Sequence, residues 1–206
     1  MLFGAFWLAV ALSGAAHAAG PHPVGTGEYH LPASTDPSVL VDQATELWAQ
    51  VWFPRDLLHQ SPAHALPLVV MLHGNHETCG HGSNPRVDTG CEYTGAGTCP
   101  EGDVVVPNHL GYSYAAEELA SQGAWVVSIN ANRGITCNSG SGDDSGLNLA
   151  RGRLVLRHLE MLRKWSGQEG GAPASVGLGE SEWKDRIDFS DVGLMGHSRD
   201  ACLSRG

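Results

Sequence analysis

The chain has 206 residues, of which 42% are hydrophobic and 17% are charged, and it carries a formal net charge of −10 at pH 7. This composition excludes a disordered chain, which would have fewer apolar and more charged residues, and the length suits one ordinary domain. The 12 Lys and Arg residues form no cluster that would neutralise a phosphate backbone, so we expect no nucleic-acid partner.

The first 18 residues have the features of a secretory signal peptide. An apolar run over residues 2–12 leads into Ala16-His17-Ala18, which fits the A-x-A pattern for signal peptidase, although no Lys or Arg precedes the run. The run is shorter than the roughly 20 apolar residues of a membrane span, so a permanent anchor is the weaker interpretation. We expect residues 1–18 to be removed, residues 19–206 to form one domain, and the protein to be secreted or periplasmic with no stable membrane insertion.

Five cysteines in an exported chain predict disulfide bonds, because an oxidising compartment permits them. Cys79, Cys91, Cys99 and Cys137 lie within the body of the chain and would form two bridges. The three possible pairings cannot be told apart from the sequence. Cys202 is then left without a partner in the tail.

The first predicted elements are strands. Residues 20–41 are rich in Pro and Gly and indicate an extended lead-in, with an edge strand as one option. Residues 46–54 alternate apolar and polar side chains with the period of two that is typical of a strand. Residues 66–74, "LPLVVMLHG", are a continuous apolar run, which predicts a central strand covered on both faces.

The remaining elements alternate between helix and strand. Residues 75–108 show no usable periodicity, and a loop of this length is usually functional or cross-linked. Helical spacing of apolar residues predicts helices over residues 111–123 and 146–165. Apolar runs predict further buried strands over residues 124–132 and 191–196.

This order of elements predicts an α/β fold with a mostly parallel sheet and helices on both faces, because right-handed crossovers place the helices there. In such folds the ligand chemistry lies outside the carboxyl ends of the strands. Those ends are residues 73–75, 130–134 and 196–199.

The last of these strand ends carries a candidate nucleophile. Gly196-His197-Ser198-Arg199 directly follows an apolar strand and supplies four positions of the G-x-S-x-G nucleophile elbow. A serine hydroxyl is a weak nucleophile until a general base takes its proton, so Ser198 would need partners. Taken alone, the tetrapeptide also fits a serine that caps an ordinary strand-to-helix turn.

The strand end at His73-Gly74-Asn75 favours the elbow over the cap. Serine hydrolases with this elbow place a second oxyanion donor after an earlier strand, and two backbone N–H groups aimed at a negative oxygen stabilise it strongly. The donors here would be the N–H groups of Asn75 and Arg199. His73 is then interpreted as a packing residue of the turn.

With these motifs in place, the chain resembles the N-terminal half of a secreted bacterial α/β-hydrolase of the chlorophyllase-like and polyester-hydrolase-like group. The resemblance spans residues 24–199 and is carried by "VVMLHGNH", "NHLGYSYAAEELASQGAWVVSINAN", "DDSGLNLARGRLVLRHLEML" and "DFSDVGLMGHSR". It implies hydrolysis of small-molecule or polymeric carboxylic esters by Ser198, an acid after a later strand and a histidine near the C-terminus, without a cofactor. The substrate and the oligomeric state stay open.

The tail departs from that family pattern. Asp200-Ala201 stands where the family has two glycines, and "CLSRG" has no helical apolar stripe. We therefore expect an incomplete α/β-hydrolase domain, from a frameshifted or truncated reading frame, that lacks the acid and the histidine of the triad and catalyses little or nothing. The strand before Ser198 would then be an unprotected apolar edge and prone to aggregation.

Other histidines offer two weaker hypotheses. His76, His81 and His109 follow strand ends, but a substitute base would need a third group to orient its imidazole. His73, His76, Cys79 and His81 provide ligand types that zinc prefers, but their spacing matches no strong zinc pattern, so we predict no metal site and favour disulfides. The alternative function is a non-catalytic exported protein with a disulfide-linked or metal-binding His/Cys loop.

Overall fold

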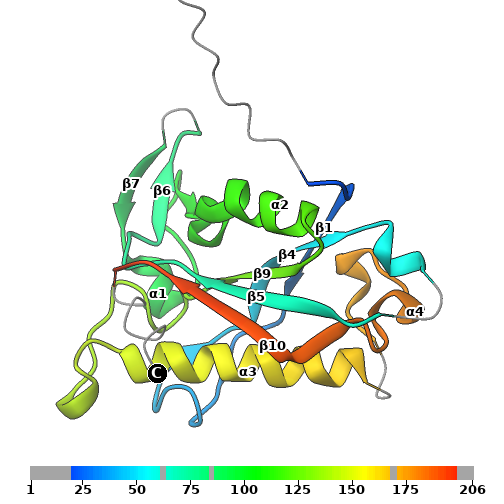
Figure 1. Ribbon diagram of the computed structural model, residues 1–206. Coiled ribbons are helices and arrows are strands. Elements are labelled where there is room, and N and C mark those ends of the chain that lie inside the picture. Colours follow the sequence, from blue (N-terminus) through cyan, green and yellow to red (C-terminus); the bar gives the residue numbers. More distant parts are fainter. Residues whose placement is uncertain (1–19, 61–63, 84–85, 168–170, 199–206) are drawn as a thin grey trace, which may run out of the picture.

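The computed structural model describes residues 20–60, 64–83, 86–167 and 171–198 (Figure 1). The expected signal peptide over residues 1–18, the oxyanion donor Arg199 and the tail with Cys202 lie outside the described residues.

A five-stranded sheet forms the centre of the molecule, with the strand order β1-β4-β9-β5-β10. The strands are β1 (Val24–His30), β4 (Trp48–Pro54), β5 (Leu66–Leu72), β9 (Trp125–Asn130) and β10 (Ile187–Gly196). β5 pairs parallel with both β9 and β10, whereas β4 pairs antiparallel with both β1 and β9. The sheet is therefore mixed, and the prediction of a mostly parallel sheet is wrong. Parallel neighbours need a crossover connection, usually a helix, whereas no helix lies between β1 and β4, so β4 runs back antiparallel to β1.

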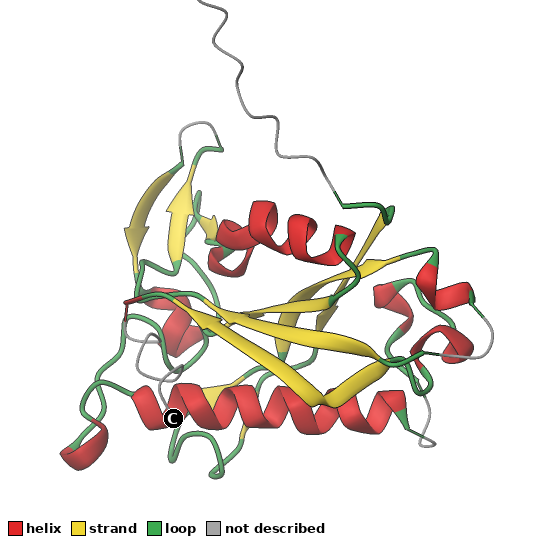
Figure 2. Ribbon diagram, viewed as in Figure 1, coloured by secondary structure: helices red, strands yellow, loops and turns green. Residues whose placement is uncertain are grey.

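Helices cover both faces of this sheet, as predicted. α2 (Ser113–Ser121) lies on one face and α3 (Asn148–Ser166) on the other (Figures 1 and 2). Neighbouring residues of a strand contribute to different cores: Val126 packs with Ala116 of α2, whereas Val127 belongs to the larger core that includes Leu154 of α3. This two-sided burial explains why the central strands are continuous apolar runs.

The segment between β5 and α2 contains regular structure that its sequence pattern does not reveal. β6 (Cys79–His81), β7 (Val87–Gly90) and β8 (Val104–Val105) form a small antiparallel sheet beside the short helix α1 (Glu92–Ala96). These strands are too short to show a period, so the prediction of an irregular loop is wrong there. Two disulfides, Cys79–Cys99 and Cys91–Cys137, fasten the segment and settle the pairing.

The other elements are short connections. They are β2 (Ser34–Thr35) paired with β3 (Ala44–Thr45), the helix α4 (Glu180–Trp183), and the 3₁₀ turns η1 (Leu57–His59), η2 (Asn108–Tyr112), η3 (Gly142–Asp144) and η4 (Ala174–Val176). None of the helices among the described residues is long and apolar enough to cross a membrane.

β10 is an edge strand of the sheet that the structure describes. It begins at Ile187, earlier than predicted, and its pairing with β5 shifts register between Asp188 and Val192. Leu194 is 44% exposed, so the expectation of a strand buried on both faces is wrong, while the expectation of an apolar edge agrees with the structure. An open strand edge of this kind can template pairing with another chain.

Candidate active site at the carboxyl ends of β5 and β10

The two predicted site segments lie side by side. Gly196 pairs with Leu72 in the parallel register of β10 and β5, so the residues after each strand leave the sheet together. A Cβ atom added to Gly74 would lie 3.0 Å from the Ser198 Cβ and 3.0 Å from the His197 Nδ1. Gly74 therefore allows a close approach of the elbow, whereas a Cβ atom at this position would push the elbow away by a few tenths of an ångström.

Ser198 has the backbone conformation of a strained turn. Its φ angle is +62°, in the left-handed region that costs a residue with a side chain about 1–2 kcal/mol. The residue is exposed, and within the described part of the chain its hydroxyl makes no hydrogen bond. A nucleophile elbow holds its serine in this way, on a sharp turn between a strand and the next segment.

Asn75 is placed to present a backbone donor at the same edge. No hydrogen bond among the described residues uses its N–H group, whereas its side-chain Oδ1 accepts the N–H of Cys137 at 2.9 Å. Asn75 as a whole residue is exposed. Arg199, the other expected donor, lies outside the described residues.

His73 holds the end of β5 in place. Its Nε2 accepts the N–H of Ala131 at 2.9 Å, and its Nδ1 lies 2.8 Å from the Gly74 carbonyl oxygen, to which it donates. The guanidinium of Arg151 on α3 donates to the His73 carbonyl oxygen at 2.8 Å. Burial lowers the pKa of His73 to about 3, so the ring is neutral and both nitrogens are engaged. The interpretation as a packing residue agrees with these contacts.

The imidazole of His76, from the earlier segment, lies close to the elbow. Its ring centroid is 6.3 Å from that of His197, with the planes 5° apart, and 6.5 Å from that of His73. No carboxylate of the described residues pairs with His76 or His197. The arrangement thus lacks the third group that orients a catalytic base.

His81 and His109, the other two histidines considered as bases, interact with residues away from Ser198. His81 pairs with Asp103 at 3.2 Å within the small sheet. His109 is 1% exposed and shares a hydrogen bond of 3.0 Å with Asn130, and burial lowers its pKa to about 4.

The candidate zinc ligands do not form a site. The Cys79 sulfur is bonded to Cys99, and the imidazole of His73 is engaged by backbone groups. In the described ranges, no three His, Cys, Asp or Glu side chains are arranged to hold a metal ion. The disulfide interpretation of this segment is the correct one.

A buried carboxylate cluster lies at the opposite edge of the sheet and was not predicted. Both Glu46 oxygens accept the Tyr93 hydroxyl at 2.9 Å, and one lies 2.9 Å from the His30 Nε2. His30 ends β1, four strand positions from β10, which is about 19 Å at the usual strand spacing. This His–Glu pair is therefore too far away to activate Ser198. The hydrogen bonds from Tyr93 of α1 to Glu46 join distant parts of the chain, so no local sequence pattern predicts them.

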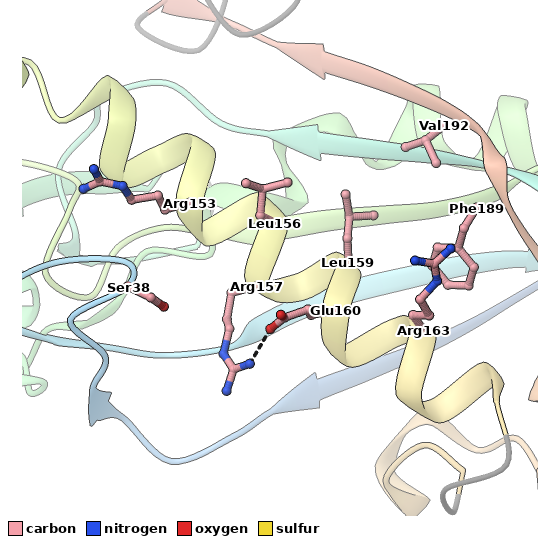
Figure 3. A pocket seen from close by; sticks show the side chains of 9 residues that line it. All are labelled: Ser38, Arg153, Leu156, Arg157, Leu159, Glu160, Arg163, Phe189 and Val192. Carbon is pink, nitrogen blue, oxygen red and sulfur yellow. Dashed lines mark hydrogen bonds and ion pairs between the residues drawn. The ribbon is translucent and has the colours of Figure 1, made fainter.

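A groove of about 520 Å³ runs between α3 and β10 (Figure 3). Its apolar lining includes Leu156, Leu159, Phe189 and Val192, and Arg163 lies over the Phe189 ring at 5.5 Å. None of the predicted site residues lines it.

Comparisons with known proteins give likeness to solved structures but none by sequence. No protein-family model matches the chain, and no curated protein matches it by sequence. Among solved structures 34 chains match. One is a ferulic acid esterase from Streptomyces cinnamoneus, with 18% sequence identity and a TM-score of 0.47, matched over 91% of this chain and 56% of that chain. The chain thus spans little more than half the length of that structure, and its mixed sheet with flanking helices is compatible with an α/β fold.

Proposed function

We propose that the chain is a serine hydrolase of the α/β-hydrolase type that acts on carboxylic esters, with Ser198 as the nucleophile. The observation that carries this proposal is the geometry of Ser198, which has a φ angle of +62° two residues after the end of β10 and lies close to Gly74 of the neighbouring strand end. In α/β-hydrolases the nucleophilic serine lies on such a strained turn, which exposes its hydroxyl at the end of a strand.

In the proposed reaction the Ser198 oxygen attacks the carbonyl carbon of the ester. The carbonyl oxygen becomes an oxyanion while the hydroxyl proton passes to water, the oxyanion then re-forms the carbonyl as the bond to the alcohol breaks, and the alcohol leaves with a proton from water. The resulting acyl-serine is hydrolysed by water to the acid and free serine. The Asn75 N–H, which has no partner within the described residues, would bind that oxyanion together with the N–H of Arg199. His73 fixes the turn that carries Asn75 and takes no part in proton transfer.

The described residues provide no general base for Ser198. In the part of the chain that the structure describes, the Ser198 hydroxyl has no hydrogen-bond partner, and neither His76 nor His197 is oriented by a carboxylate. We accordingly propose that this 206-residue chain alone turns over esters slowly or not at all, with only the effect of the oxyanion donors.

The class of substrate and the location follow from the same features. An exposed serine at a sheet edge suits a small-molecule or polymeric ester. Two disulfides fit an oxidising compartment, so the proposed location is secreted or periplasmic.

The test is covalent labelling with a fluorophosphonate, in which the serine oxygen displaces fluoride from phosphorus. We expect slow labelling of folded protein, mapped to Ser198 by peptide mass spectrometry and abolished in Ser198→Ala. Turnover of p-nitrophenyl acetate should stay within a few fold of the Ser198→Ala variant. Folded protein that takes up no label would overturn the assignment of Ser198. Rapid ester turnover that depends on Ser198 would overturn the proposed lack of a base.

A further inference from the structure

One of the two disulfides touches the candidate oxyanion loop directly. The N–H of Cys137 donates to the Asn75 side-chain Oδ1 at 2.9 Å, and the Cys137 Sγ lies 3.3 Å from the His76 carbonyl oxygen. The Cys91–Cys137 bridge therefore contacts both the side chain of Asn75 and the next peptide along the chain. These contacts flank the backbone N–H that the proposed function assigns to the oxyanion.

Cys137 is itself held in an unfavourable backbone conformation. Its φ angle is +65°, which persists in a residue other than glycine only where the surroundings impose it. The preceding residue supplies that constraint, since the Thr136 carbonyl accepts the Thr94 hydroxyl at 2.7 Å and the Thr136 hydroxyl accepts an Arg151 N–H at 3.1 Å. The loop after β9 is thus shaped so that the Cys137 N–H points at Asn75.

Cys91, the other cysteine of the bridge, is also held by its surroundings. Cys91 directly precedes α1, and further hydrogen bonds join this short helix to the loop after β9. The Gly134 N–H donates to the Thr94 carbonyl at 2.9 Å, and Arg133 donates to the Tyr93 carbonyl at 2.9 Å. The bridge therefore connects the residue that contacts Asn75 to a helix that is itself hydrogen-bonded to the loop after β9.

The second disulfide provides a natural comparison. Cys79–Cys99 fastens the same segment of the chain, and the Cys79 sulfur accepts the Tyr93 N–H at 3.3 Å. Within the described structure, neither of its cysteines is hydrogen-bonded to Asn75 or His76. Loss of this bridge would loosen the segment without removing the contact to Asn75.

From these contacts we propose that the Cys91–Cys137 disulfide is a positioning element of the catalytic site, which fixes the Asn75 N–H through the hydrogen bond from Cys137 to the Asn75 side chain. The proposal rests on the proposed function for its effect on reactivity, but the contact itself is independent of that function. Small displacements of an oxyanion donor are costly, since a misplacement of about 1 Å lowers rates by up to ~10²-fold.

The first measurement compares labelling of Ser198 by a fluorophosphonate in three proteins that retain a native near-UV circular dichroism spectrum. Cys91→Ala/Cys137→Ala should be labelled at least tenfold more slowly than the unaltered chain. The matched control, Cys79→Ala/Cys99→Ala, should stay within about twofold. Equal slowing in both double variants would overturn the proposal, because it would mean that either bridge merely tightens the segment.

The second measurement does not depend on the reaction. Hydrogen exchange followed by mass spectrometry should show at least tenfold faster exchange at the Cys137 amide in Asn75→Ala, with both disulfides intact. Asn75→Asp retains an oxygen acceptor and should restore the protection. If the unaltered chain takes up no label, the proposed function fails and the exchange data alone decide the positioning contact. Unchanged exchange in Asn75→Ala would overturn the proposal, and this variant also decides the matter if the cysteine double variant does not fold.

Discussion

Replacing Ser198 by glycine should stabilise the protein relative to Ser198→Ala, although both remove the candidate nucleophile. At φ of +62°, a residue with a Cβ atom incurs about 1–2 kcal/mol that glycine avoids. The greater freedom of glycine in the unfolded chain offsets about 0.4–1 kcal/mol of this gain. The net expectation is a difference of about 0.5–1 kcal/mol in the free energy of unfolding, or about 1–4 °C in Tm for a domain of this size.

Urea unfolding of the two variants, followed by circular dichroism, measures this difference. The same pair of substitutions at Ser113, where φ is −50° at the start of α2, is the matched control. There alanine should be the more stable by about 1 kcal/mol, because glycine is the poorer helix former. If Ser198→Gly is no more stable than Ser198→Ala while the Ser113 pair behaves as expected, the elbow is not strained and the reasoning is wrong.

Three further outcomes follow from the structure. Gly74→Ala should slow fluorophosphonate labelling of Ser198 at least tenfold, because the added Cβ would lie 3.0 Å from the Ser198 Cβ; unchanged labelling would show that the elbow moves aside freely. Burial lowers the pKa of three histidines, His73 to about 3, His109 to about 4 and His158 to about 3. Below pH 6.5 the unfolded chain binds protons at these rings and the folded chain does not, so stability should fall as pH drops from 6.5 toward 4, by about 1 kcal/mol per pH unit for each histidine. Urea midpoints measured across that range test the slope, which His158→Gln should reduce by about one third. Leu194→Lys on the exposed edge strand should reduce aggregation measured by light scattering, with little change in Tm. If the variant aggregates as much as the unaltered chain, the edge of β10 is not the surface through which the chains associate.

The two strand ends that carry the candidate site could be located from the sequence. Apolar runs ending in His73-Gly74-Asn75 and in Gly196-His197-Ser198 mark two strand ends, and the structure pairs those strands directly. Helices α2 and α3 could also be predicted from the sequence, because the apolar stripe of a helix repeats over many residues of one segment. The local pattern of apolar residues is sufficient to predict a helix or strand when the periodicity of that element lies within one continuous segment.

Long-range contacts decided the rest. The antiparallel pairing of β4, the edge position of β10 and the choice between three disulfide pairings depend on which segments meet in space. The contact between Asn75 and Cys137 joins residues 62 positions apart, and the buried pair of Glu46 and Tyr93 joins residues 47 apart. A periodic pattern reports only how one segment distributes its own apolar side chains. It records neither the direction nor the identity of the partner segment. The sequence alone therefore determined the longer elements and the strand ends, and only the tertiary structure brought those strand ends together.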